Sequence, residues 1–323
     1  MKLLLVTVRG LEKAVAREAE ARGLRVLGMP MRSRVLVEGD VDNAAGLRTV
    51  SAICALLGIG EIAEEGLRGL RLAVREALRA GGSVEGPVSV RAYVSGRCFP
   101  PRTVELVASR EVRRVMGVET DPSADRTVQV DVDCRRGRVY ASLRIVSPAS
   151  GRRPYYVRRH PRSLNPLIAA SVPWLVGVRE DDLLYDPMCG SGTIPIEASL
   201  SLGCRCIGSD VNPKYVNAAR ENARHAHTPV DFFVADAANP PLDPSLVDLA
   251  ATDPPRSPLS VALRATRAVL RAGYERVALV TPHLSLSIDI ARGLGYAVEE
   301  MWRTFQGGDM VYILVLRGSR QQR

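Results

Sequence analysis

The most informative segment of this chain reads Asp186-Pro187-Met188-Cys189-Gly190-Ser191-Gly192-Thr193. It connects a short apolar run over 183–186 to a helical pattern over 191–202. The two glycines let the backbone turn tightly and direct the N–H groups at the start of the helix toward a ligand. A dinucleotide-binding fingerprint has a third glycine, where this chain has Pro195, a residue that suits a first helical turn. The segment therefore predicts a strand–turn–helix ligand site that lacks the usual pyrophosphate contact.

Strand-like and helical patterns alternate after this segment. Strand-like runs cover 205–210, 230–235, 247–252 and 275–281, and helical patterns cover 213–226, 257–272 and 284–293. Asn212 and Pro213 suit the cap and the first position of the helix over 213–226. Two last strands, over 298–304 and 311–316, are joined through 306–309. The alternation predicts an α/β, Rossmann-like domain over 167–323, with a mostly parallel sheet and a C-terminal antiparallel hairpin.

Acidic residues end the second and third of these strands. Asp210 lies 18 residues beyond Gly192, where a carboxylate can accept both hydroxyls of a ribose. That position does not by itself separate a nicotinamide dinucleotide from S-adenosylmethionine. Asp236 is placed where it or its neighbours can contact the amino group of an adenine, and a plain loop aspartate is the alternative.

The fourth strand ends in Asp253-Pro254-Pro255-Arg256. Two prolines fix the backbone and remove two donors, so that carbonyl oxygens project as acceptors. If Asp253 and the carbonyl of Pro254 each accept one N–H of an exocyclic amine, the nitrogen is held with its lone pair toward a methyl donor. Catalysis is then mainly alignment and stabilisation of the developing charge, with no need for a metal. The alternative is a simple strand terminator.

The first half of the chain has a different organisation. Residues 1–58 read strand, helix, strand, helix, strand, which is typical of a small α+β ferredoxin-like unit. An amphipathic helix over 62–80, a strand over 88–93, a helix over 103–115 and a hairpin over 127–143 follow. We therefore expect a second unit over 59–148 and a linker over 149–166, which is rich in Pro, Ser, Gly, Arg and Tyr.

Basic charge is concentrated in the first half and in the linker. The net charge is +6 for residues 1–150, +5 for 151–165 and −2 for 166–323. This asymmetry favours a nucleic-acid partner, although only 3 of the 44 basic residues are Lys, so genome composition is an alternative. The expected RNA contacts are Arg152, Arg153, Tyr155, Tyr156, Arg158 and Arg159 in the linker and Arg110, Arg113 and Arg114 on the helix over 103–115.

Other features of the composition limit the remaining possibilities. With 46% hydrophobic and 24% charged residues, the chain is typical of a globular protein. It has no apolar run of about 18 residues and no signal-peptide core, so we expect a cytoplasmic protein without a membrane segment. The six cysteines form no CxxC pair and no zinc spacing with histidine, so we expect no metal. A Cys98–Cys134 disulfide stays open.

The chain resembles a known family at several of these motifs. Residues 186–198 and Asp253-Pro254-Pro255 are similar to class I S-adenosylmethionine-dependent RNA guanine-N2 methyltransferases. The first half is similar to the THUMP RNA-binding module with its ferredoxin-like companion, through Thr7-Val8-Arg9-Gly10-Leu11-Glu12, Leu47-Arg48-Thr49-Val50 and the stretch 159–166. The resemblance implies a tRNA methyltransferase that modifies the N2 amine of a guanosine in the acceptor stem, of the guanosine-6 type, and we expect a monomer.

The resemblance also implies a set of site residues. We assign S-adenosyl-L-methionine binding to Asp186, Met188, Cys189, Gly190, Ser191, Gly192, Thr193, Asp210, Val211, Asp236, Ala237 and Asn165. We assign catalysis to Asp253, Pro254, Pro255 and Arg256. The family usually has Tyr or Phe where this chain has Arg256, whose guanidinium can stack on a base and reach a phosphate. The alternatives are another tRNA guanosine at the D-arm junction (position 10), rRNA, DNA or a protein amide as substrate, or an RNA-binding protein with a weakened catalytic half.

Overall fold

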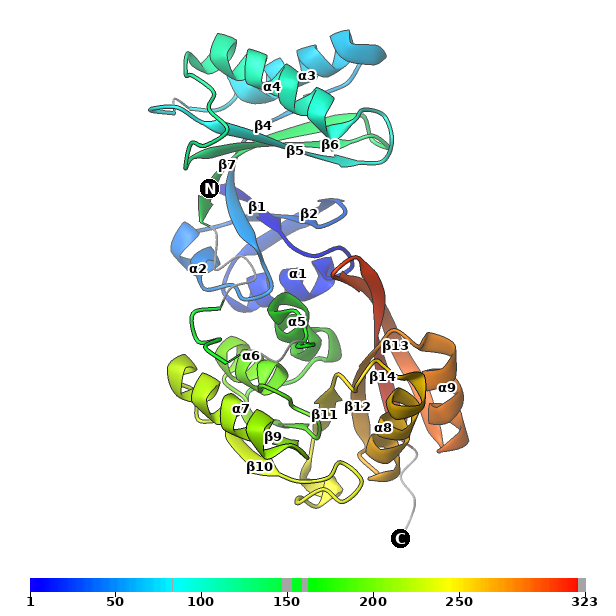
Figure 1. Ribbon diagram of the computed structural model, residues 1–323. Coiled ribbons are helices and arrows are strands. Elements are labelled where there is room, and N and C mark those ends of the chain that lie inside the picture. Colours follow the sequence, from blue (N-terminus) through cyan, green and yellow to red (C-terminus); the bar gives the residue numbers. More distant parts are fainter. Residues whose placement is uncertain (83, 147–152, 159–161, 319–323) are drawn as a thin grey trace. The chain divides into compact units, whose positions relative to one another are not determined.

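The structure is a computed structural model (Figure 1) that describes residues 1–82, 84–146, 153–158 and 162–318. The chain forms two compact units. The first unit comprises Met1–Thr7 and Ala19–Pro148, and the second comprises Val8–Glu18 and Ala149–Arg323. The segment Val8–Glu18 therefore belongs with the second unit, although it lies inside the first half of the sequence.

One seven-stranded sheet, in the order β2-β3-β1-β4-β7-β6-β5, is the core of the first unit. Its strands are β1 (Lys2–Val6), β2 (Arg25–Met31), β3 (Arg34–Glu38), β4 (Ala52–Glu61), β5 (Ser89–Ser95), β6 (Thr127–Asp133) and β7 (Arg138–Val146). Neighbouring strands are antiparallel except for β5 and β6, which are parallel. Helices α3 (Gly66–Arg79) and α4 (Pro101–Met116) pack over β4, β5, β6 and β7, whereas α2 (Val41–Ala45) is short (Figure 1).

Strand β4 belongs to both of the units that the sequence analysis expects in the first half, over 1–58 and 59–148. It pairs with β1 along one edge and with β7 along the other. The expected boundary between residues 58 and 59 thus falls inside a strand that is shared by both parts of one sheet. Cys98 and Cys134, whose pairing the sequence left open, form a disulfide.

A buried ion pair connects β3 and β6 of this sheet. The guanidinium of Arg34 donates from Nε and Nη2 to the two carboxylate oxygens of Asp131, at 3.1 and 2.7 Å. The two side chains are 4% and 0% exposed. Gln129 donates a further hydrogen bond to Asp131 at 2.9 Å, and the Arg34 guanidinium lies 4.5 Å from the ring centroid of Tyr93. The network satisfies charges that would otherwise be costly to bury.

We predict that Asp131→Ala lowers the free energy of unfolding by about 3–5 kcal/mol, because it leaves the buried Arg34 guanidinium without its counter-charge. Chemical denaturation followed by circular dichroism measures the change. Glu64→Ala is a control, because its ion pair with Arg68 is exposed and is worth about 0–1 kcal/mol. Equal effects of the two substitutions would contradict this account of the network.

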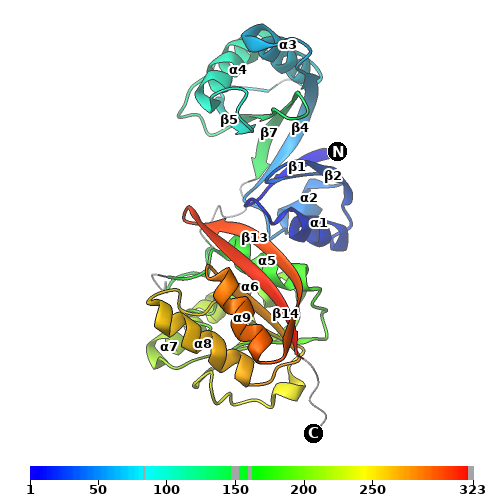
Figure 2. The same ribbon diagram turned by 90° about the vertical axis from the view of Figure 1, so that its right-hand side faces the viewer.

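The second unit contains a seven-stranded sheet in the order β10-β9-β8-β11-β12-β14-β13. Strands β8 (Leu183–Asp186), β9 (Arg205–Asp210), β10 (Asp231–Val234), β11 (Leu249–Thr252) and β12 (Arg276–Thr281) are parallel. Strand β14 (Asp309–Gly318) is antiparallel to β12 and forms a long antiparallel hairpin with the edge strand β13 (Tyr296–Gln306), which appears in orange and red in Figure 2. The predicted Rossmann-like sheet with its C-terminal hairpin is therefore confirmed.

Helices cover both faces of this sheet. They are α5 (Pro166–Val176), α6 (Thr193–Leu202), α7 (Pro213–Ala226), α8 (Leu259–Arg271) and α9 (Leu284–Gly293), with a 3₁₀ turn at Pro244–Leu246. Buried strand residues alternate between the two layers: Ala251 and Ala278 pack with α5, α6 and α7, whereas Ala250 and Val277 pack with α8 and α9. This period-2 alternation is typical of a sheet that is buried on both faces.

The sequence analysis did not predict helix α5, and it placed the start of α1 with the first half of the chain and not with the second unit. Helix α5 follows the linker and is almost entirely buried, and it begins where the side chain of Asn165 accepts a hydrogen bond from the Leu167 N–H. The start of α1 (Glu12–Ala21) packs here too, and Arg17 donates to the carbonyl oxygens of Trp174 and Leu175 near the end of α5. Basic groups are favourable at the carboxyl end of a helix. Among the described helices, none is both long and apolar enough to cross a bilayer.

Candidate active site

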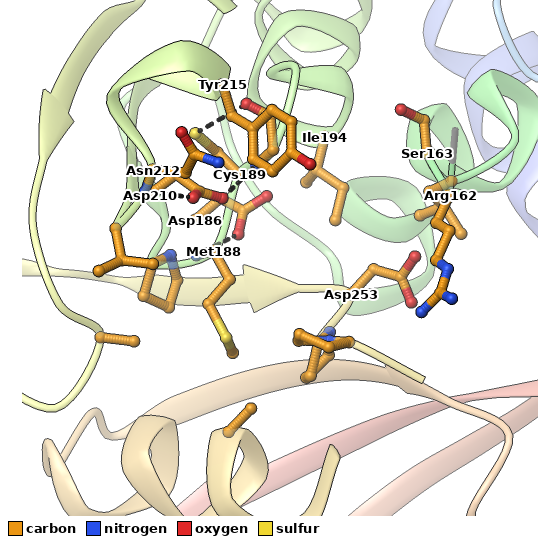
Figure 3. Close-up of a pocket in the computed structure, with 18 of the residues that line it drawn as sticks. Arg162, Ser163, Asp186, Met188, Cys189, Ile194, Asp210, Asn212, Tyr215 and Asp253 are labelled. Atoms are coloured by element: carbon orange, nitrogen blue, oxygen red, sulfur yellow. Dashed lines mark hydrogen bonds between the residues drawn. The ribbon is translucent and has the colours of Figure 1, made fainter. Parts of the chain in front are cut away.

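A cavity of about 780 Å³ opens at the carboxyl ends of the parallel strands of the second unit (Figure 3). The loops after β8, β9, β10 and β11 contribute to its lining together with α8 and the segment before α5, and the strand ends are where ligands bind in open α/β sheets. Residues assigned from the sequence that line it are Asp186, Met188, Cys189, Gly190, Ser191, Thr193, Asp210, Val211, Asp236, Ala237, Asp253, Pro254, Pro255 and Arg256. The structure thus brings the glycine turn and the acid-diproline corner (Asp253-Pro254-Pro255) to one site.

The glycine turn after β8 depends on the absence of side chains. Gly190 and Gly192 have φ values of +53° and +82°, a region that L-residues with side chains rarely adopt. A Cβ on Gly192 would lie 2.8 Å from the Phe232 ring and 3.1 Å from Ala219. Gly192 does not line the cavity, so its part is to allow close packing of α6 beside the site rather than to contact a ligand.

Asp210 holds the turn in place from the neighbouring strand. One of its carboxylate oxygens accepts a hydrogen bond from the Gly190 N–H at 3.0 Å, and the other accepts one from the Asn212 N–H at 2.9 Å. Asn212 in turn caps α7 by accepting from the Lys214 N–H, as the sequence predicted. The carboxylate is therefore fixed at the tip of β9 with lone pairs that can still accept from hydroxyl groups of a ligand.

Asp186 is the most deeply buried carboxyl group of the site, with 2% of the residue exposed. It accepts a hydrogen bond from the Met188 N–H at 3.1 Å. Burial, together with repulsion from Asp210 and Asp253, raises the pKa of Asp186 to about 8. Near neutral pH this carboxyl group is therefore mostly protonated in the ligand-free protein, and a positively charged ligand would favour its ionised form.

Asp253, at the end of β11, is paired with Arg256. The Arg256 Nη2 atom lies 2.8 Å from one carboxylate oxygen and 3.1 Å from the other, and Nε lies 3.2 Å from the second. Burial raises the pKa of Asp253 to about 6, and the charge of Arg256 and its hydrogen bonds oppose that rise. The guanidinium therefore binds the carboxylate of the acid-diproline corner.

The segment before α5 closes the other side of the site. The Tyr156 hydroxyl lies 2.9 Å from the Ser191 hydroxyl and 3.2 Å from that of Thr193, and the Ser163 hydroxyl lies 3.0 Å from that of Ser191. Arg158 pairs with Glu221 on α7 at 2.8 Å and remains largely exposed. These contacts bind the described part of the linker to the start of α6 and to α7.

Several assignments from the sequence need correction. Arg153 and Tyr155 were expected to contact RNA, but both are buried, and each donates a hydrogen bond to the buried carboxylate of Glu197 on α6, at 2.9 and 2.7 Å. Asn165 was expected to bind the cofactor, but it caps α5 and does not line the cavity. Arg110, Arg113 and Arg114 are exposed on α4 of the first unit. Arg152 and Arg159 lie outside the described residues.

The cavity also has lining residues that the sequence analysis missed. They are Arg162, Ser163, Leu164, Pro187, Ile194, Asn212, Tyr215, Val261, Arg264, Ala265 and Ala268. The lining residues on α8 are spaced one, three and four positions apart, which places them on one face of the helix. This spacing is the only feature of the sequence that could have indicated them. Arg162 donates to the carbonyl of Ser257 at 3.0 Å. Over the described ranges of the chain, no group of three His, Cys, Asp or Glu residues could hold a metal ion.

The chain is similar to known methyltransferases over part of its length. Residues 153–257 match a family model described as RMKL-like, methyltransferase domain. The chain is 38% identical over 105 residues to a tRNA (guanine(10)-N2)-dimethyltransferase of Methanothermobacter thermautotrophicus, covering 32% of this chain and 30% of that protein. It is 29% identical over 214 residues to a tRNA (guanine(6)-N2)-methyltransferase of Archaeoglobus fulgidus, covering 59% of this chain and 51% of that protein. The matches thus span about a third to a half of these relatives.

The solved structures agree over a longer part of the chain. The crystal structure of TrmN from Thermus thermophilus superimposes with a TM-score of 0.76 at 25% identity and covers 98% of this chain and 99% of that one. A structure titled as a possible methylase from Clostridium difficile 630 superimposes with the same TM-score at 18% identity and covers 100% of this chain and 99% of that one. The fold is therefore that of class I methyltransferases, with an added N-terminal half.

We predict that Asp186→Asn stabilises the ligand-free protein in a pH-dependent manner. The folded pKa of about 8 exceeds the ordinary value of 3.8, so the folded state binds more protons between these values, and this carboxyl destabilises the fold as the pH rises from about 4 to about 8. Asparagine keeps an acceptor for the Met188 N–H but never ionises. We expect a gain of roughly 5 kcal/mol at pH 8.5 that falls to near zero at pH 4.

Thermal unfolding of wild type and variant over this pH range measures the effect. Asp248→Asn, a change at an exposed position, controls for the loss of one negative charge. A stability difference that is the same at every pH would show that ionisation of Asp186 is not its cause.

Proposed function

We propose that this protein transfers a methyl group from S-adenosyl-L-methionine to the exocyclic N2 amine of a guanosine in tRNA, of the guanosine-6 type. The observation that carries the proposal is that the acid-diproline corner at 253–255 and the glycine turn at 190–192 belong to one site, with the corner and Gly190 lining one cavity. A methyl donor and an amine acceptor can then meet at the edge of the sheet.

The volume of the cavity and the acidic residues that line it are suited to this cofactor. Its volume of about 780 Å³ lies within the range of small-molecule sites, about 300–1,000 Å³. The Asp210 carboxylate can accept from ribose hydroxyls, and Asp236, which follows β10 and lines the same cavity, is proposed to contact the adenine. The buried carboxyl groups favour a cation, and S-adenosylmethionine supplies an electrophilic methyl group on a positively charged sulfur.

Asp253 and Pro254 carry the chemistry at the acceptor in this proposal. The amine of guanine is a poor nucleophile because its lone pair is delocalised into the ring. Asp253 and the Pro254 carbonyl each accept one N–H, which directs the lone pair toward the methyl carbon. As the N–C bond forms and the C–S bond breaks, the nitrogen becomes cationic, and the Asp253 carboxylate stabilises that charge and takes the surplus proton.

The first unit supports an RNA substrate. It contains the exposed arginines of α4, and phosphate contacts of this kind give affinity without reading sequence. We propose that this unit is a THUMP-like RNA-binding part with a ferredoxin-like companion, as the sequence predicts for 1–58 and 59–148. A paired guanosine has to leave its stack to reach the cavity, at a cost of roughly a few kcal/mol.

A second candidate has its own support. The most identical of the relatives described above is named for guanine 10 and for dimethylation, so a guanosine at that position is the alternative target. Incubation with cofactor carrying a deuterated methyl group, followed by mass mapping of tRNA nucleosides, separates position 6 from position 10 and single from double methylation. Parallel reactions with DNA and with protein test the substrate class, and label in either of these but not in tRNA would overturn the proposal.

We predict that Asp253→Ala reduces methyl transfer to tRNA by at least about 1,000-fold and changes cofactor affinity by less than about threefold, because the carboxylate acts on the acceptor. Radiometric transfer assays and calorimetry measure the two effects. Asp248→Ala, at an exposed position, is the control. Turnover that stays near wild type in Asp253→Ala would refute its role.

We predict the opposite pattern for Asp210→Ala. Loss of a carboxylate that accepts from ribose hydroxyls is expected to weaken cofactor binding by roughly 10–100-fold, because hydrogen bonds to a charged group contribute about 1.5–3 kcal/mol. Calorimetric titration with S-adenosylhomocysteine measures it. Unchanged affinity would count against ribose binding by this side chain.

A further inference from the structure

Resting on the proposed function, we infer that Arg256 is a positioning residue. Its guanidinium, which is held by Gln306, orients the Asp253 carboxylate toward the substrate amine. The positive charge of Arg256 also keeps Asp253 ionised, so that Asp253 can accept a hydrogen bond from the amine. This goes beyond stacking on a base or contacting phosphate, which are the roles that the sequence suggested for Arg256. The inference stands on the contacts of three side chains from two separate segments, the loop after β11 and the end of β13.

The first step is the geometry of the pair. Arg256 contacts both oxygens of Asp253 through Nη2, and Nε contacts one of them, with distances of 2.8–3.2 Å. A planar guanidinium that forks onto a carboxylate fixes its rotation as well as its position. The two side chains are 21% and 11% exposed, so water screens the pair little.

The second step is that Arg256 is itself fixed. Its Nη2 atom donates to the Gln306 side-chain carbonyl at 3.1 Å, and its own backbone carbonyl lies 2.9 Å from Nε2 of His283. The Gln306 carbonyl also accepts from the Asn165 N–H at 3.2 Å, while the Gln306 amide group donates to the Ser163 carbonyl at 3.2 Å. Gln306 thus ties the end of β13 to the segment before α5 and to the loop after β11.

The third step is that this pairing leaves Asp253 able to act. A carboxylate has about four acceptor sites, and a guanidinium fork binds along one edge of it. The remaining lone pairs can accept an amine N–H while Arg256 stays in place. Arg256 therefore orients the acceptor without having to leave it.

The charges around Asp253 define what removal of Arg256 changes. Asp186, at the end of β8, interacts with Asp253 electrostatically, and Asp210 of β9, Arg162 before α5 and Arg264 of α8 line the same cavity. Burial raises the pKa of Asp253 and Arg256 lowers it, which leaves it at about 6. Without the guanidinium the carboxyl takes up a proton at higher pH, and a protonated carboxyl is a poorer acceptor.

The test is the pH dependence of methyl transfer to tRNA by wild type and Arg256→Gln between pH 5.5 and 8.5. For wild type, we expect kcat to fall on the acid side with a midpoint near 6. For Arg256→Gln, we expect the midpoint to rise by at least about one unit, so that kcat falls at least about tenfold below wild type at pH 6.5 and recovers to within about threefold at pH 8.5. Arg267→Gln, an exposed change on α8 outside the cavity, is the matched control.

Two further variants separate charge from orientation. Arg256→Lys keeps the charge without the fork, so its acid midpoint is expected to stay near that of wild type. Its kcat is expected to fall at every pH by no more than the roughly threefold loss that Arg256→Gln retains at pH 8.5. Gln306→Ala releases the guanidinium and is expected to shift the midpoint in the same direction as Arg256→Gln, by a smaller amount.

Three outcomes would overturn the inference. They are a loss of kcat in Arg256→Gln that is equal at all pH values, a kcat unchanged from wild type at every pH, and a kcat that increases because the carboxylate is freed. If wild type transfers no methyl to tRNA, the proposed function fails, and ¹³C NMR titration of the Asp253 carboxyl, assigned with Asp253→Asn, still decides. A midpoint that is equal in wild type and Arg256→Gln would overturn the inference in that case too.

Discussion

The site depends on one electrostatic constraint, which is that carboxyl groups are gathered at the edge of a sheet where little water reaches them. Asp186 and Asp253 both have a raised pKa because burial disfavours their charge. Buried carboxylates are stable only when cations or hydrogen-bond donors compensate them. Backbone N–H groups compensate the charge of Asp210, and the guanidinium of Arg256 compensates that of Asp253. A cationic cofactor would compensate the ionised form of Asp186.

The same need explains why distant segments meet at this edge. Arg256 compensates Asp253 and is held by Gln306 of the C-terminal hairpin. Beneath the turn, the buried Glu197 of α6 is neutralised by Arg153 and hydrogen-bonded by Tyr155. The described part of the linker is thus a structural component of the second unit, in which Arg153 compensates the acid that α6 buries and Arg158 pairs with Glu221 of α7.

Much of the second unit could be predicted because its strands and helices alternate and each ends at a recognisable cap or turn, as at Asn212. The acidic residues at the strand ends were predicted too, since their chemistry depends on local position. Strand β2 was missed because Gly28 and Pro30 interrupt its pattern, and α5 because it is apolar on all sides. Burial of Arg153 depends on Glu197, 44 residues away, and no local pattern carries that information.

The central claim is that the acid-diproline corner at 253–255 faces the bound methyl donor across the cavity. A crystal structure of the protein with S-adenosylhomocysteine tests it most directly. The account predicts that the ribose hydroxyls contact Asp210 and that the sulfur points toward Asp253 and Pro254, with room between them for one purine. A ligand whose sulfur points away from this corner, or that binds outside the cavity, would contradict the account.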